Sequence, residues 1–234
     1  MTMTAERRVA GGGEGDRRCS NADLLRRLGD ISPERVRLWS MSGCATVGDV
    51  ATIQGREKRL FELVNGVLVE KCMGWRESVL VMAIGEALRG WVVPRKLGAV
   101  SGESGMMRLF GNDVRIPDVA FVSRARLGDG GEGAADVPVP PLVPDLVVEV
   151  LSESNTKAEM ARKRQEYFEA GVRLLWEVDP KNKSVAVYTG VEQMEVVGEH
   201  GVLNGGEVLP GFTLSLKAIF DEVDGLFKPP SKKS

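Results

Sequence analysis

The sequence is poor in the residues that build zinc sites and catalytic triads. Its 234 residues include one histidine, His200, which lies between Glu199 and Gly201. A Ser-His-Asp hydrolase or a histidine-based zinc site needs histidine beside other matched residues, and the neighbours of His200 supply none. We therefore interpret His200 as a surface turn residue and exclude both chemistries.

Cysteine is also scarce. The three cysteines, Cys19, Cys44 and Cys72, are odd in number, widely spaced and without a C-x-x-C pair. This spacing indicates neither a zinc ribbon nor a disulfide framework. Reduced thiols of a cytosolic protein are the simplest interpretation, so we expect a cytoplasmic location.

Long apolar runs and aromatic residues are few. No apolar run approaches the roughly 20 residues that span a bilayer. The first 18 residues carry charges without the apolar segment of a secretory signal, so we expect no membrane association. Aromatic residues make up 6% of the chain, so any platform for stacking single-stranded nucleic acid would have to be local. The net charge of −2 argues against a polyanion-coating protein but permits a local basic groove.

The overall amino-acid composition is that of an ordinary globular protein, with 43% hydrophobic and 27% charged residues. We predict a disordered lead-in over residues 1–20, a helical preamble over 21–54, one main domain over 55–227 and a flexible tail over 228–234. Within the preamble, Pro33 suits the first turn of a short helix, PERVRLW.

Periodicity predicts a hairpin and then a helix at the start of the main domain. The segment LFELVNGVLVEK places two strand-like runs around Asn65-Gly66, the pair favoured in two-residue type I′ turns. Strict alternation in the first run separates Glu62 from its immediate neighbours, which lie on the other face. Apolar residues then recur at helical spacing, which predicts a helix from Trp75 to Val93.

Later strands alternate with a second helix. The nearly continuous apolar run Leu146–Leu151 fits a strand covered on both faces at the centre of a sheet. Thr156 and Glu159 form a T-x-x-E capping box at the start of a helix that Gly171 ends. The strand–helix–strand unit Asp145–Asp179 could place its two strands parallel. The segment SLKAIF is interpreted as a final turn. The predicted fold class is α/β, a mixed central sheet flanked by helices with an N-terminal β-hairpin.

Three charged residues fall where burial is expected. Glu149 interrupts the apolar run, and an unpaired carboxylate in a central strand has to be paired, protonated or metal-bound. Asp118 begins another apolar strand. Lys163 shares one helix face with Tyr167 by the 3-and-4 spacing and is aimed near the sheet.

Two acids that converge with a lysine suit metal-assisted phosphodiester hydrolysis. The acids would hold one or two Mg²⁺ ions, whose preference for oxygen ligands they match. The metal would activate water and neutralise charge on the phosphate, while the lysine would position or deprotonate that water, or hold the phosphate. Periodicity alone leaves open a structural ion pair between Glu149 and Lys163, with a capping role for Asp118.

At these residues the chain resembles a known family. Four segments carry the resemblance: F-E-L-V-N-G-V-L-V-E-K-C-M-G, R-I-P-D-V-A-F-V, P-D-L-V-V-E-V-L-S-E-S-N and K-R-Q-E-Y-F-E-A-G-V-R-L-L-W-E-V-D-P. They are similar to the Uma family of putative restriction endonucleases, a branch of the PD-(D/E)XK nuclease superfamily. The similarity covers roughly Leu60 to Phe220. It implies a restriction endonuclease-like fold and an endodeoxyribonuclease that depends on Mg²⁺, for which Mn²⁺ can substitute.

The resemblance also implies roles for residues. Asp118 fills the acid of the PD element, and Glu149 fills the acid of the (D/E)XK element. Two residues after Glu149, where the superfamily has Lys, this sequence has Leu151. Lys163 would then reach the site from a different element. Glu77 on the first helix is a candidate for an extra metal ligand.

Several residues keep two interpretations. Glu77 is either a metal ligand or a solvated acid at a helix start, and Glu62 is either a site residue or an ordinary hairpin charge. Tyr167 either takes part in the chemistry or packs with its hydroxyl bonded near the site, and packing is the simpler interpretation. Four basic residues are either phosphate contacts or solvated surface charges: Arg124, Arg126, Arg162 and Arg164.

The sequence leaves three functions open. The first is the DNA endonuclease, for which a homodimer would suit cutting both strands of a duplex. The second is a catalytically impaired nucleic-acid-binding or regulatory protein on the nuclease scaffold, an interpretation motivated by Leu151. The third is a structural interaction module in which Glu149 and Lys163 only pair.

Overall fold

The described part of the chain contains two main sheets with one helix between them. The computed structural model describes residues 20–37, 43–128 and 136–227. The predicted lead-in before Ser20, the predicted tail after Phe227 and part of the Gly-rich loop after Gly128 lie outside the described residues. Within the described ranges, no helix combines the length and the apolar character that crossing a membrane requires.

The first sheet contains the predicted hairpin. Its strands lie in the order β1 (Val36–Arg37), β3 (Val67–Glu70), β2 (Phe61–Val64), β6 (Asp113–Arg115) and β5 (Met107–Phe110). Asn65 and Gly66 both have positive φ, 48° and 75°, as a type I′ turn requires. The hairpin is confirmed, but it belongs to a separate five-stranded sheet and not to the central one.

The second sheet is the mixed central sheet. Its six strands lie in the order β11 (Met194–Val197), β10 (Ser184–Tyr188), β9 (Leu174–Asp179), β8 (Leu146–Val150), β7 (Val119–Ser123) and β4 (Gly98–Ser101). The predicted parallel pair is confirmed, because β8 and β9 run parallel while the other pairs are antiparallel. As the apolar run predicted, β8 is central and buried at every residue.

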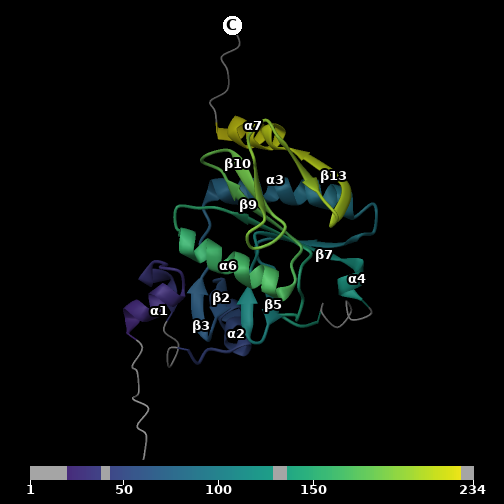
Figure 1. The fold of residues 1–234 in the computed structure, drawn as a ribbon. Helices are drawn as coiled ribbons and strands as arrows, with labels where there is room; N and C mark the ends of the chain where they lie inside the picture. Colours follow the sequence, from purple (N-terminus) through teal and green to yellow (C-terminus); the bar gives the residue numbers. More distant parts are fainter. Residues whose placement is uncertain (1–19, 38–42, 129–135, 228–234) are drawn as a thin grey trace, which may run out of the picture.

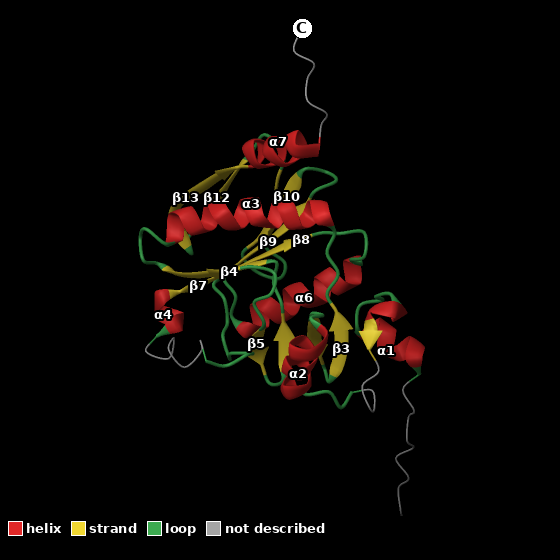
Figure 2. Cartoon of the chain, turned by 180° about the vertical axis from the view of Figure 1, so that it is seen from behind, coloured by secondary structure: helices red, strands yellow, loops and turns green. Residues whose placement is uncertain are grey.

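Helices cover both faces of the six-stranded sheet. On one face lie α3 (Trp75–Val92) and α7 (Leu216–Phe227), and on the other lies α6 (Lys157–Ala170). Helices α1 (Asn21–Arg27) and α2 (Val47–Glu57) pack instead on the hairpin strands of the five-stranded sheet, and the short α4 (Arg124–Leu127) follows β7. Figure 1 and Figure 2 show the same succession of layers: α7, α3, the six-stranded sheet, α6 and the five-stranded sheet. A small hairpin of β12 (Val202–Gly205) and β13 (Leu209–Ser215) lies on the α3 side.

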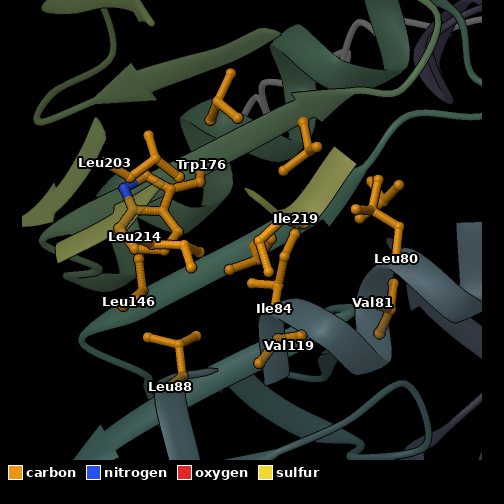
Figure 3. Packing of buried hydrophobic residues seen from close by; sticks show 14 of the residues in the cluster. Leu80, Val81, Ile84, Leu88, Val119, Leu146, Trp176, Leu203, Leu214 and Ile219 are labelled. Carbon is orange, nitrogen blue, oxygen red and sulfur yellow. The ribbon is translucent and has the colours of Figure 1, made fainter. Parts of the chain in front are cut away.

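Strand alternation divides the residues of β8 between these layers. Leu146, Val148 and Val150 belong to the large core formed with α3, α7, β12 and β13. Figure 3 shows Leu146 in this core, together with residues such as Leu88 and Leu214. Val147 belongs to the cluster on the opposite face, where α6 packs. Because side chains alternate, Glu149 also points toward α6.

Helix α6 is bonded to both sheets. Toward the five-stranded sheet, Lys163 pairs with Glu62 of β2, and Glu166 pairs with Arg115 of β6. Toward the six-stranded sheet, Tyr167 joins the buried cluster that includes Val147. The polar composition of α6 is therefore explained by ion pairs that it makes between two layers.

Two local predictions were wrong. The segment SLKAIF is not a turn: after Ser215, which ends β13, it begins helix α7, because Leu216, Ile219, Phe220 and Val223 bury one helical face. The described part of the predicted helix PERVRLW is only a 3₁₀ turn, Pro33–Arg35, because Val36 and Arg37 form β1 and pair with β3; its last two residues lie outside the described residues.

Candidate active site

Asp118 and Glu149 come together because β7 and β8 are neighbours. The antiparallel register pairs Val119 with Val148. Asp118, one residue before β7 begins, is therefore opposite Glu149, and residues opposite each other share a face. Both carboxylates are buried. The predicted pair of acids thus meets at one end of the two strands.

Asp118 is held by the backbone of the neighbouring strand and by a lysine. Its Oδ2 accepts a hydrogen bond of 2.6 Å from the backbone N–H of Val150. Its Oδ1 lies 2.6 Å from Nζ of Lys71. These contacts orient the carboxylate beside Glu149 and compensate its charge.

Glu149 is bound from α6. Its Oε1 accepts a hydrogen bond of 2.5 Å from the hydroxyl of Tyr167, and its Oε2 lies 3.5 Å from Nζ of Lys163. Burial raises the pKa of Glu149 to about 7. The positive charges of Lys163 and Lys71 favour its ionised form, but the negative charges of Asp118 and Glu62 oppose ionisation. Tyr167 has the expected position, with its hydroxyl bonded at the site.

Lys163 bridges two acids from different sheets. Its Nζ lies 3.1 Å from Oε1 of Glu62, closer than to Glu149. Burial disfavours the ionised form of Glu62, but the charges of Lys163, Arg115 and Lys71 outweigh this effect and lower its pKa to about 2. The two carboxylates raise the pKa of Lys163 although burial opposes this. Glu62 is therefore part of the cluster and not a solvated hairpin charge.

Sequence reasoning missed Lys71. Besides Asp118, its Nζ contacts the backbone carbonyl of Ile116 at 2.5 Å. The register of the hairpin contained the necessary signal. Glu62 pairs with Val69, so Lys71, two residues further on, lies on the face of Glu62.

These side chains surround a small cavity, here called the site cavity. Its volume is about 20 Å³, enough for one water or one small ion. Its charged lining residues are Arg35, Glu62, Lys71, Asp118, Glu149 and Lys163. Two open grooves share lining residues with it. The larger, of about 1100 Å³, shares Ser152 and Asn155, and the smaller, of about 350 Å³, shares Lys71 and Met73.

Glu77 does not join the other two predicted metal ligands. It lines the larger groove, and its Oε2 lies over Gly74, the residue that caps the N-terminus of α3. The positive end of the helix dipole favours an acid there, which supports the helix-start interpretation. Among the described residues, no three side chains of Asp, Glu, Cys or His are grouped as a metal site would require.

The four predicted phosphate-binding arginines have different surroundings. Arg124 and Arg126 lie beyond the end of β7 that is opposite to Asp118, and Arg126 binds Asp145 and three backbone carbonyls. Arg162 pairs with Glu166. Arg164 pairs with Glu177 and lies over the ring of Tyr188, while also lining the larger groove. Arg164 is therefore the one of the four that lines a groove next to the site cavity.

Leu151 lines the larger groove in place of the expected lysine. Lys71, which follows the hairpin, and Lys163 of α6 bring ammonium groups to the acids instead. Cys44 and Cys72 are free thiols, and Cys72 lines the site cavity. Cys19 lies outside the described residues.

The donor set fits a hard divalent cation. Mg²⁺ commonly binds through one or two carboxylates and keeps its remaining positions for water and substrate phosphate. Asp118 and Glu149 supply two such carboxylates at the wall of the site cavity. The ammonium of Lys71 is already held between oxygen atoms of Asp118 and Ile116, so these oxygens favour positive charge.

The fold is that of a nuclease-like α/β protein. The structure is similar to the crystal structure of a putative nuclease belonging to DUF820 from Anabaena variabilis ATCC 29413, with a TM-score of 0.62 and 19% sequence identity. The match covers 71% of this chain and 92% of that chain. At this identity the similarity establishes the fold.

The family follows from the sequence. Residues 50–217 match the Uma2 family, described as putative restriction endonuclease. The chain therefore belongs to this nuclease family, as the resemblance predicted. The matched region contains all the acids and both lysines of the site cavity. No curated protein matches the chain.

Proposed function

We propose that this protein is a metal-dependent endonuclease that hydrolyses DNA phosphodiester bonds at the site cavity. One observation carries the proposal: Asp118 and Glu149 are buried, lie opposite each other and have lysine ammonium groups beside them. Burial of like charges is costly, so such an arrangement is typical of a site that receives a cation. Membership of a nuclease family supports the same function.

Asp118 and Glu149 are the proposed ligands of Mg²⁺, for which Mn²⁺ could substitute. The bound cation would supply positive charge to the phosphate and lower the pKa of a bound water. Glu77 is left out of this ligand set because it lies over the start of α3. Glu62 acts instead on the charge balance of the cavity, through Lys163.

The two lysines have separate roles in this proposal. Lys163 lies between Glu62 and Glu149, so its charge keeps the two acids together. Lys71 lines both the site cavity and the smaller groove, so its ammonium can meet a phosphate that approaches along that groove. Lys71 would orient the phosphate or protonate the leaving oxygen, a task for which Leu151 has no suitable group.

The larger groove is the proposed path of the phosphate backbone. Lys157 and Lys181 are exposed on its lining, and Arg164 also lines it. Contacts of this kind position the backbone without reading base sequence. Cutting both strands of a duplex would need two sites, for which we propose a homodimer.

The proposal is tested with plasmid DNA in Mg²⁺ or Mn²⁺. We expect Asp118→Ala and Glu149→Ala to abolish cleavage, and Lys71→Met to slow it by about 100-fold or more, within the range for loss of a proton-transferring group. Glu195→Ala, on the exposed strand β11, is the matched control and should cleave like the wild type. Cleavage that survives Asp118→Ala and Glu149→Ala would refute the site assignment.

Leu151 favours one alternative function. Because an apolar side chain lines the groove where the superfamily has lysine, the chain could bind nucleic acid without cutting it. DNA affinity that falls steeply with salt, without cleavage in either metal, would favour that binding function over the endonuclease.

A further inference from the structure

We infer that the smaller groove receives an unstacked nucleobase, so that the substrate is single-stranded or base-extruded nucleic acid. The inference rests on the proposed function and specifies its substrate class. Its central residue is Trp75, the first residue of α3, which is 78% exposed and lines this groove. We call it the Trp75 groove.

The position of Trp75 is more informative than its exposure. Single exposed apolar residues are common on protein surfaces. Met82, on the same helix, is also exposed, at 69%, but lines none of the described cavities. Trp75, by contrast, lies in a groove that shares Lys71 and Met73 with the site cavity. An aromatic side chain thus lines a groove that adjoins the cavity of the proposed catalytic acids.

The other lining residues suit a nucleobase. Leu60 and Met73 are apolar, and Glu103 and Ser78 add polar atoms. The hydroxyl of Ser78 donates to the carboxylate of Glu103 at 3.5 Å, so this weak contact can be exchanged for a ligand. A carboxylate accepts hydrogen bonds from amino groups such as N4 of cytosine. An aromatic side chain, apolar neighbours and one acceptor together match a base with an exocyclic amine.

The Trp75 groove adjoins the site cavity, so a nucleobase bound in the groove would lie near the proposed reaction. Lys71 is common to both spaces, and its Nζ lies 2.6 Å from Asp118. A nucleotide with its base in the Trp75 groove would therefore place its phosphate toward Lys71. In an intact duplex both faces of a base are covered by neighbouring pairs, so stacking on a side chain needs an unpaired or extruded base.

The test uses full-length protein in EDTA, so that no metal-dependent cleavage interferes. The probes are a 12-nucleotide dC strand and a dT strand of the same length. We expect Trp75→Ala to weaken binding of the dC strand by about tenfold, because base stacking on an aromatic residue contributes on this scale. Trp75→Phe should recover most of this affinity. Met82→Ala is the matched control and should bind like the wild type.

Several results would overturn the inference. They are single-strand binding by Trp75→Ala equal to that of Met82→Ala, no recovery by Trp75→Phe, or no measurable binding of single strands. Equal affinity of the wild type for dC and dT would remove the role of Glu103. If Trp75→Ala has no effect while Asp118→Ala abolishes cleavage, the proposed function stands and this inference fails.

Discussion

At the residue scale, the charges of the site are stabilised by one another. Lys163 is buried between Glu62 and Glu149, and Lys71 is bonded to Asp118. Removal of one member leaves buried charge without compensation, which costs far more than loss of a surface ion pair. The alternative of a structural ion pair and the proposed cation site therefore involve the same residues.

We predict that Lys163→Met destabilises the protein by about 3–5 kcal/mol at neutral pH, because Glu62 and Glu149 would lose their shared cation. Urea unfolding measures the change. Lys157→Met is the matched control, since Lys157 begins the same helix and is exposed. Its free energy of unfolding should stay within about 0.5 kcal/mol of the wild type. Equal stability of the two variants would show that Lys163 is not needed to compensate the acids.

At the element scale, helix α6 begins with a cap that the sequence predicted and with an ion pair that only the tertiary structure shows. Thr156 caps the helix as the T-x-x-E pattern predicted, because its hydroxyl accepts from the N–H of Glu159. The side chain of Glu159 does not complete the capping box. It binds the guanidinium of Arg35 with two hydrogen bonds, of 2.9 and 2.8 Å, because the 3₁₀ turn before β1 lies next to the helix start.

The pH dependence of stability should report this pair. Burial alone would raise the pKa of Glu159, but the hydrogen bonds from Arg35 and the charge of Lys163 lower it below the ordinary value of 4.5. A carboxyl whose pKa is lowered by folding stabilises the protein above its unfolded pKa and loses this effect as pH falls through the folded pKa. We predict that Glu159→Gln costs about 3 kcal/mol at pH 7 and that the difference from the wild type shrinks below about pH 4.5.

Urea unfolding at several pH values between about 3 and 7 measures this difference. Lys217→Met breaks an exposed pair with Asp221 and is the control. It should cost less than about 1 kcal/mol. A wild-type advantage over Glu159→Gln that is constant with pH would contradict ionisation of Glu159 as its source.

At the scale of the whole molecule, α6 connects two sheets whose apolar residues lie mostly in different clusters, while Met107 and Leu109 of β5 join the cluster of the six-stranded sheet around α6. Phe61 and Leu63 of β2 pack in the cluster around α2, whereas the strands of the six-stranded sheet pack around α3 or α6. The bonds of α6 to β2 and β6 cross between these layers. We therefore expect the two sheets to unfold together.

Native-state hydrogen exchange tests this coupling. In the wild type, amides of β2 and β3 should open with free energies close to those of β8. Arg115→Met should lower the protection of β2 and β3 more than that of β8, because it removes the ion pair between β6 and α6. Much weaker protection of β2 and β3 than of β8 in the wild type would show that the sheets are independent units.

The candidate site was partly visible in the sequence. Asp118, Glu149 and Lys163 were identified because charges within apolar patterns have few physical explanations. Lys71 was missed although the hairpin register places it on the face of Glu62. Glu77 was assigned to the metal by resemblance alone, and its position over Gly74 depends on the start of α3.

The sequence by itself determined the hairpin turn, the central apolar strand and the start of α6, because turn chemistry, strand alternation and capping are local. It also determined that Glu149 needs a partner. Only the tertiary structure decided which partners it has and that the hairpin belongs to a second sheet. That choice depends on β7 pairing with β8 and on α6 packing between two layers. Contacts between residues far apart in the chain leave no periodic trace, so local patterns do not specify them.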